Sequence, residues 1–329
     1  MIKRVLITGS AGFVGSHTTD WILDKTDWEV VGIDSFRHLG DVERVNARPR
    51  YTMICHDLNA PISQRTKDRI GRIDYIINCA SISHVDTSIS DPIYVWESNT
   101  ALIGNILKYA RELDSLEKFI HCSTDEVFGA ANQGYSHHEW DVIAPSNPYA
   151  ASKAAQDALC FAFWRTYGVP IAVTHCMNMI GTTQDPEKYL PKIVSRVLKG
   201  EVVPVHGQPG KIGSRMYIDC RNLADAWLFM LQGIDFNVYG EDCSKMTKFN
   251  IAGLDEITNL ELAQKIADKM NLPLKYELVD FHQTRPGHDL RYALDSSKIY
   301  EAGWKPPIDL DTTFDEVIEH VKSFKSWQE

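Results

Sequence analysis

Short apolar runs alternate with longer segments of mixed polarity over the first half of the chain. Runs rich in valine, isoleucine and other strand-forming residues predict buried strands at 4–8, 29–34, 51–55, 73–78, 118–121 and 170–175. Between them, the pattern predicts helices over 12–25, 91–113 and 148–167. Strands that alternate with helices predict an α/β fold, a Rossmann-like doubly wound parallel sheet with helices on both faces.

The rhythm changes after Cys176. Residues 178–215 are rich in proline and predict mostly loop, with one helix near 192–199. Further segments predict a strand at 248–252 and helices at 222–231, 260–270 and 313–324. We therefore predict one large domain, 1–177 plus about 217–253, and a smaller, discontinuous C-terminal substrate lobe, 178–216 plus about 254–329.

Composition narrows the class of protein. The 329 residues are 44% hydrophobic and 24% charged, as in ordinary globular proteins, and the net charge of −10 argues against a nucleic-acid partner. The seven cysteines have no C-x-x-C spacing, and His137 and His138 lack further ligands nearby, so we expect no disulfide frame and no metal site. No apolar run reaches the length of a membrane span, and the first strand begins close to Met1. We expect a cytoplasmic protein without a membrane partner.

Three glycines lie between the first strand and the first helix. They form Gly9-Ser-Ala-Gly12-Phe13-Val14-Gly15, in which a tight turn and close backbone approach let a pyrophosphate bind at the helix N-terminus. The alternative is a turn that only packs helix against strand.

An acid ends the second predicted strand. Asp34 could accept hydrogen bonds from ribose hydroxyls and would repel a 2′-phosphate, which favours NAD over NADP. Arg37 and His38 nearby leave that preference open. Asp57, after the third strand, could lie near the adenine or could be a plain strand-end acid.

Tyr149 and Lys153 lie four residues apart at the start of a predicted helix, so both project from one face. A phenol has a pKa near ~10, and lowering it by about three units requires roughly 4 kcal/mol. A nearby ammonium and a cationic nicotinamide ring could jointly supply that energy. After a dinucleotide loop, the pair indicates alcohol oxidation; by itself it could be an ordinary surface pair.

Asp125 and Glu126 follow a buried strand. In a continuing strand their side chains would face opposite sides of the sheet, so the strand must end near Thr124 if both are to reach one ligand. Ligands of open α/β sheets bind at the carboxyl ends of strands, which suits catalysis. The alternative is a pair of surface acids in a loop.

Together these motifs resemble the extended short-chain dehydrogenase/reductase superfamily, and within it the nucleotide-sugar (dTDP-/UDP-glucose) 4,6-dehydratases. The resemblance runs nearly end to end and covers the glycine loop, 80–86, Asn99, 123–129, Tyr149 with Lys153, Asn178, 186–188 and 285–292.

The resemblance implies an NAD-dependent hydro-lyase. Tyr149, aided by Thr124, would remove the C4 hydroxyl proton as hydride passes to NAD; Glu126 would then remove the C5 proton. Asp125 would protonate the departing C6 hydroxyl, and hydride would return to C6. This chemistry needs one ionised carboxylate and one protonated acid, with pKa values pushed apart.

The resemblance also implies further contacts and a homodimer built on helices 91–113 and 149–167. It assigns the cofactor to Gly9, Gly12, Phe13, Val14, Gly15, Asp34, Asp57, Leu58, Ala80, Asn99, Tyr149 and Lys153. It assigns the nucleotide-diphosphate sugar to Ser83, His84, Asn178, Lys188, Arg215, Arg285 and His288.

The sequence departs from the family pattern at three points. Phe128 stands where tyrosine is usual, and Thr87 where arginine is common. The usual arginine four residues before the tyrosine of the phosphate-contacting segment is missing; Arg215 or Lys211 could serve the diphosphate instead, and Arg285 is favoured. Two other functions stay open: a C4 epimerase or uronate decarboxylase on the same scaffold, and a non-catalytic nucleotide-sugar sensor with structural NAD.

Overall fold

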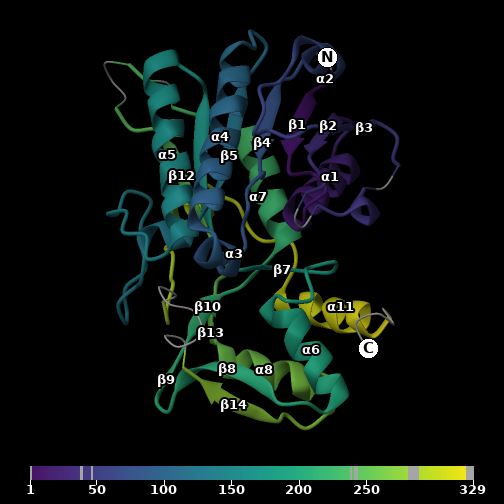
Figure 1. Ribbon diagram of the computed structural model, residues 1–329, viewed down its shortest axis with the longest axis vertical. Coiled ribbons are helices and arrows are strands. Elements are labelled where there is room, and N and C mark those ends of the chain that lie inside the picture. Colours follow the sequence, from purple (N-terminus) through teal and green to yellow (C-terminus); the bar gives the residue numbers. More distant parts are fainter. Residues whose placement is uncertain are drawn as a thin grey trace.

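A seven-stranded parallel sheet forms the centre of the larger part of the molecule (Figure 1). The computed structural model describes residues 2–37, 40–45, 47–237, 239–240, 244–280 and 289–323. In spatial order the strands are β12 (Thr247–Ile251), β6 (Ile171–Cys176), β5 (Lys118–Thr124), β4 (Tyr75–Asn78), β1 (Arg4–Thr8), β2 (Glu29–Asp34) and β3 (Tyr51–Cys55). Every pairing in the sheet is parallel, so the predicted doubly wound α/β fold is confirmed.

Helices cover both faces of this sheet because successive strand residues point to opposite sides. Val5 and Ile7 pack in a core with α1 (Phe13–Lys25) and α7 (Cys220–Gly233), whereas Leu6 packs in a second core. That second core contains residues of α2 (Gln64–Ile70), α4 (Pro92–Arg111) and α5 (Pro148–Tyr167). Helices α4 and α5 lie side by side (Figure 1).

The remaining part of the chain has a core of its own. Helices α6 (Tyr189–Lys199), α8 (Asn259–Lys269) and α11 (Leu310–Ser323) pack around it, with Val194, Ile266 and Phe314 completely buried or nearly so. A small sheet joins β8 (Val203–Gln208) to β14 (Tyr276–Val279) and β9 (Lys211–Ile212). These elements fill the lower part of Figure 1. A separate core supports the predicted smaller lobe, whose boundaries stay a prediction.

Most predicted elements agree with the structure within a few residues, but the segment 178–215 is less irregular than predicted. It contains β7 (Met179–Ile180) and β10 (Ser214–Met216) besides β8 and β9. Strands β7, β10 and β8 pair with strands distant in sequence, β11 (Ile218–Asp219), β13 (Glu256–Thr258) and β14, whereas β9 pairs with the adjacent β8. Short strands of this kind carry little periodic signal and form only once the distant partner is in place. Among the described residues, three short helices, α2, α3 (Val85–Ser90) and α10 (Ser297–Glu301), were not predicted either.

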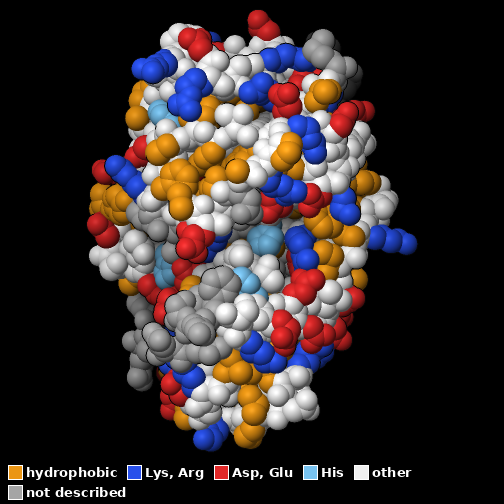
Figure 2. Space-filling view, turned by 90° about the vertical axis from the view of Figure 1, so that its right-hand side faces the viewer, with side chains coloured by type: hydrophobic (Ala, Val, Ile, Leu, Met, Phe, Trp, Pro, Cys, Tyr) orange, Lys and Arg blue, Asp and Glu red, His pale blue; other side chains and the backbone are white. Residues whose placement is uncertain are grey.

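The surface shown in Figure 2 carries acidic and basic side chains intermixed, and it is hollowed between the upper and lower parts of the molecule. Over the described residues, no helix combines the length and the apolar character that crossing a membrane requires.

Candidate active site

A cavity of about 560 Å³ opens at the carboxyl ends of the central strands. The strand order reverses between β1 and β4, which is where open α/β sheets bind ligands. Most residues that the sequence singled out line this one cavity: Gly9, Gly12, Phe13, Val14, Gly15, Asp34, Asp57, Leu58, Ala80, Ser83, His84, Thr124, Asp125, Glu126, Tyr149, Lys153, Asn178 and Lys188.

The glycine loop leaves no room for side chains at two positions. Gly9 has φ of +68°, and a Cβ there would lie 2.9 Å from the amide nitrogen of Ala80. A Cβ on Gly15 would lie only 2.1 Å from the carbonyl oxygen of Gly9. Because Gly12, Gly15 and the residues between them line the cavity, the N-terminus of α1 brings its partial positive charge to it.

Asp34 holds this loop through hydrogen bonds and also lines the cavity. One carboxylate oxygen accepts a 3.0 Å hydrogen bond from the amide of Ala11, and the other accepts a 2.9 Å bond from the amide of Phe36. Each oxygen has a second lone pair for a ligand hydroxyl. Arg37 forms a 2.8 Å ion pair with Asp57. It is one of the two basic residues that left the choice between NAD and NADP open. His38 lies outside the described residues.

The two acids reach the cavity because β5 ends at Thr124, as predicted. A 3-10 helix, η2 (Asp125–Phe128), begins there. The Thr124 hydroxyl donates a 2.9 Å bond to Asp125 Oδ1 and accepts a 3.4 Å bond from the amide of Glu126. The change from strand to helical turn places adjacent acids at one cavity.

The two carboxyl groups, of Asp125 and Glu126, have different surroundings. Burial, and then the charge of Glu126, raise the pKa of Asp125 to about 7. Burial also raises the pKa of Glu126, but a 2.8 Å hydrogen bond from Asn147 Nδ2 and the charge of Arg215 oppose that rise. Asn147 caps α5 and was missed as a site residue, because an Asn-Pro pair signals a helix start and not a contact with Glu126.

Tyr149 and Lys153 both lie buried on the first turns of α5. Lys153 Nζ donates to the carbonyl oxygen of Cys122 at 2.8 Å and to Gln156 Oε1 at 2.6 Å. Burial, and then the charge of Glu126, raise the pKa of Tyr149 well above its usual value. Burial and the nearby carboxylates dominate this pKa among the protein's own groups, and the expectation that the ammonium of Lys153 and a cationic nicotinamide ring jointly lower it stays a prediction.

Two expected ligand contacts lie behind the cavity wall. Asn99 is completely buried, and its side chain accepts a 2.8 Å bond from the amide of Ile82. Arg215 donates to the carbonyl oxygens of Ser214, Leu290 and Asp289 at 2.6 to 2.8 Å. Neither residue lines the cavity.

The other diphosphate candidates are Lys211 and Arg285. Lys211 is exposed on β9 and does not line the cavity, whereas Arg285 lies outside the described residues, as does His288, which was expected to contact the substrate. The group that binds the diphosphate therefore stays a prediction.

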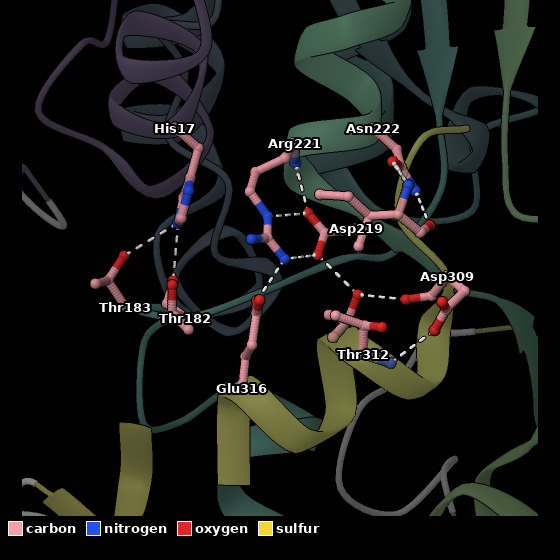
Figure 3. Close-up of polar contacts among 11 residues, drawn as sticks. His17, Thr182, Thr183, Asp219, Arg221, Asn222, Asp309, Thr312 and Glu316 are labelled. Carbon is pink, nitrogen blue, oxygen red and sulfur yellow. Dashed lines mark hydrogen bonds and ion pairs between the residues drawn. The ribbon is translucent and has the colours of Figure 1, made fainter. Parts of the chain in front are cut away.

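The loop after β7 is held from both parts of the molecule. Figure 3 shows His17, on α1, pointing at this loop, and its Nε2 lies 2.9 Å from the carbonyl oxygen of Thr182. Thr183, with φ of +61°, donates its amide to His320 Nε2 on α11 at 3.1 Å. Since residues 184–185 line the cavity, these contacts fix part of its wall.

In the described part of the chain, no group of three or more His, Cys, Asp or Glu side chains is arranged to hold a metal ion.

The family model for GDP-mannose 4,6 dehydratase matches residues 6–319. The chain belongs to this family. Among curated relatives of this dehydratase-family protein, the dTDP-glucose 4,6-dehydratase of Neisseria meningitidis is 32% identical, over 99% of this chain and 95% of its own. The low-salt glycan biosynthesis protein Agl12 of Haloferax volcanii is also 32% identical, over 92% and 93% of the two chains.

Solved structures of similar proteins include a dehydratase and an epimerase. DesIV, a dTDP-glucose 4,6-dehydratase of Streptomyces venezuelae solved with NAD and TYD bound, is 30% identical with a TM-score of 0.86, covering 99% of each chain. The UDP-glucose 4-epimerase of Thermus thermophilus, solved with NAD, is 25% identical with a TM-score of 0.85, covering 97% of this chain and 99% of its own. The fold is thus shared by both reaction types, and the site must separate them.

Proposed function

We propose that this dehydratase-family protein is an NAD-dependent nucleotide-sugar 4,6-dehydratase, which converts a dTDP- or UDP-glucose-like substrate to a 4-keto-6-deoxy sugar. The observation that carries the proposal is the acid pair at the cavity, with Asp125 held at a pKa of about 7 beside Glu126. Simple oxidation at C4 needs only the tyrosine–lysine pair, whereas elimination needs a base and an acid in addition.

The cavity fits the adenosine and pyrophosphate of a dinucleotide. The positions of Gly9 and Gly15 exclude a Cβ, Asp34 lies at the end of β2, and Arg37 is paired with Asp57. These features favour NAD over NADP, because a 2′-phosphate would meet the carboxylate of Asp34. When bound, NAD would accept hydride from C4 and later return it to C6.

The chain's own groups move the protons. Tyr149, with Thr124 beside it, takes the C4 hydroxyl proton as the ketone forms; for this step the Lys153 ammonium and the positive charge of bound NAD would have to offset the burial that raises the pKa of Tyr149. Glu126 takes the proton from C5, which the C4 ketone has acidified, and the C5–H electron pair forms the C5–C6 double bond. Asp125 gives its proton to the C6 hydroxyl, which leaves as water. When hydride returns to C6, the protonated Glu126 gives a proton to C5, which completes the 4-keto-6-deoxy product. A carboxyl with a pKa of about 7 is protonated in roughly half of the molecules at neutral pH, whereas an ordinary Asp is almost fully ionised.

Exposed apolar side chains on α4 support a homodimer, and free cysteines support a cytoplasmic location. Helix α4 exposes three large apolar residues near its start, Ile93, Tyr94 and Trp96, and exposed apolar groups that lie together favour a protein–protein interface. The described cysteines are all free thiols, as expected in a reducing compartment.

The test is a panel of dTDP-, UDP-, GDP- and CDP-hexoses incubated with the NAD-loaded protein in D₂O, with products analysed by mass spectrometry and NMR. A dehydratase gives loss of water and deuterium at C5. An epimerase gives an isomer without deuterium, a uronate decarboxylase gives CO₂, and a sensor binds without turnover; each of these results would refute the proposal.

The roles of the acids are tested by Glu126→Gln and Asp125→Asn. Each variant should lower the rate of water loss by about 10² to 10⁴-fold, because each removes one proton transfer. C4 oxidation should continue and appear as NADH absorbance at 340 nm. Glu319→Gln, an exposed acid on α11 paired with Lys322, is the matched control and should behave as wild type. Normal turnover in either acid variant would contradict the roles.

A further inference from the structure

Gln156 bridges the lysine of the site to a neighbouring helix. It lies three residues after Lys153 on α5 and is completely buried. Its Oε1 accepts a 2.6 Å hydrogen bond from Lys153 Nζ, and its Nε2 donates a 2.7 Å bond to the carbonyl oxygen of Asn99 on α4. Both ends of the amide are therefore used, so its orientation is fixed.

Asn99 is itself held rigidly. Its side chain accepts from the amide of Ile82 at 2.8 Å, and donates to the carbonyl oxygen of Ile82 at 3.1 Å and to Ser152 Oγ at 2.9 Å. Ser81, which donates to Asn99 Oδ1, and Ile82 line the cavity. Gln156 thus connects Lys153 with the segment that forms the cavity wall after β4.

An ammonium group has three N–H donors in tetrahedral arrangement. Lys153 uses one on the carbonyl oxygen of Cys122, which belongs to β5, and a second on Gln156. Two fixed acceptors determine both the position of Nζ and its rotation, and with them the direction of the third N–H.

We propose that Gln156 is a positioning residue which, together with the carbonyl group of Cys122, directs the third N–H of Lys153 into the cofactor cavity. This inference rests on the proposed function, because it concerns how Lys153 meets NAD. If Gln156 only filled space, an apolar side chain of equal length would replace it without consequence for NAD binding.

The proposal also predicts a change in the pKa of Lys153 when Gln156 is replaced. Burial lowers the pKa of Lys153, and a hydrogen-bond acceptor on the charged form opposes that fall. The other titratable groups that face or adjoin the ammonium are Cys79 after β4, His121 and Cys122 on β5, and Tyr149, Asp157 and Cys160 on α5. Loss of the acceptor should therefore lower the pKa of Lys153, and a carboxylate in its place should raise it.

The experiment compares Gln156→Met and Gln156→Glu with wild type. NAD affinity is measured by calorimetry from pH 6 to 10, alongside kcat and KM across the same range. For Gln156→Met we expect about ten-fold weaker NAD binding, with the alkaline limb of both profiles moved to lower pH. For Gln156→Glu, which keeps the acceptor, we expect the alkaline limb to move to higher pH.

Asn222→Leu is the matched control. Asn222 is a buried amide on α7 that bonds the backbone of Ile308 through both its atoms, far from Lys153 in the chain and outside the cavity wall. It should lower the melting temperature without moving the alkaline limb.

Four results are decisive. Wild-type NAD affinity and an unmoved limb in both Gln156 variants would overturn the inference, and so would a shift in the same direction in both. If Gln156→Met does not fold, Gln156→Glu decides alone, since an unmoved or lowered limb there contradicts the proposal. A wild-type protein that neither binds NAD nor releases water would instead refute the proposed function, which keeps the two failures distinct.

Discussion

Asp125 and Glu126 are neighbours in sequence, yet the fold gives them different partners. Asp125 Oδ2 is buried and has no hydrogen-bond partner among the described residues, whereas Glu126 Oε2 accepts a bond from Asn147. A buried carboxyl oxygen without a donor is better suited to a protonated acid than to a carboxylate. The donor on Glu126 favours its ionised form. The environment thus separates the acid from the base.

The raised pKa of Asp125 should appear as a pH-dependent stability. Its pKa is about 7 in the folded protein and 3.8 in the unfolded chain, so the unfolded state loses its proton first as pH rises. Ionisation therefore costs stability progressively between about pH 4 and 7. We expect Asp125→Asn to gain on the order of 2 to 4 kcal/mol relative to wild type between pH 4 and 8. Urea unfolding at both pH values measures this; a difference that does not change with pH would contradict it.

Asn147 has two roles, both of which Asn147→Ala removes. Its side chain caps α5 by accepting from the amide of Ala150, and it donates to Glu126. Asn147→Ala should cost about 1 kcal/mol of stability through the cap. It should also raise the pKa of Glu126, so that the acid limb of the elimination rate moves to higher pH. Asp91→Ala removes the corresponding cap of α4 and serves as control, with similar destabilisation and an unmoved limb.

At the scale of elements, the loop that connects β1 to α1 can adopt its shape only because its glycines have no Cβ. We expect Gly15→Ala to weaken NAD binding about ten-fold or more, because the new Cβ would clash with the carbonyl oxygen of Gly9 and push the loop out of shape. Gly104→Ala, on α4, is the control; its Cβ would meet only Leu159 at 3.9 Å, so NAD binding should stay unchanged. Calorimetric titration with NAD compares the two variants, and equal affinity would argue against a steric role for the loop.

The strands of the large sheet were predictable because each is a run of apolar residues between turn signals, and β2 and β3 agree residue for residue with the prediction. The short strands of the smaller lobe were not, since β8 pairs with β14, more than 60 residues later. The same limit applies to the site. The motif residues were identified from spacing, but Asn147 and Gln156 gain their importance from contacts with Glu126 and Asn99, which no spacing shows.

For the whole molecule, contacts across the two parts hold the cavity together. Arg221, at the start of α7, pairs with Asp219 and with Glu316 on α11 (Figure 3). The Thr313 hydroxyl, also on α11, donates to Asp219 Oδ2 at 2.7 Å. The C-terminal helix is thereby fastened beside the loop that His17 and His320 anchor, so the shape of the cavity depends on residues from both ends of the chain.

The proposed homodimer is tested at this scale. If the exposed face of α4 forms the interface, Trp96→Glu should convert a dimer to a monomer, because a charge buried among apolar side chains without a partner is costly. Tyr276→Glu is the control, as Tyr276 is similarly exposed at 48% but lies on β14. Light scattering after gel filtration measures the mass. A monomeric wild type, or a dimeric Trp96→Glu, would refute this interface.

The sequence by itself determined the sheet, the glycine loop, the tyrosine–lysine pair and the adjacent acids. These depend on local pattern, which side-chain alternation and backbone sterics impose within a few residues. The tertiary structure decided that the pKa of Asp125 rises to about 7, that Lys153 bonds Gln156, and that Arg215 bonds backbone carbonyl groups. Those properties depend on burial and on partners brought together from distant parts of the chain, and electrostatic energies follow spatial distance, not separation in sequence.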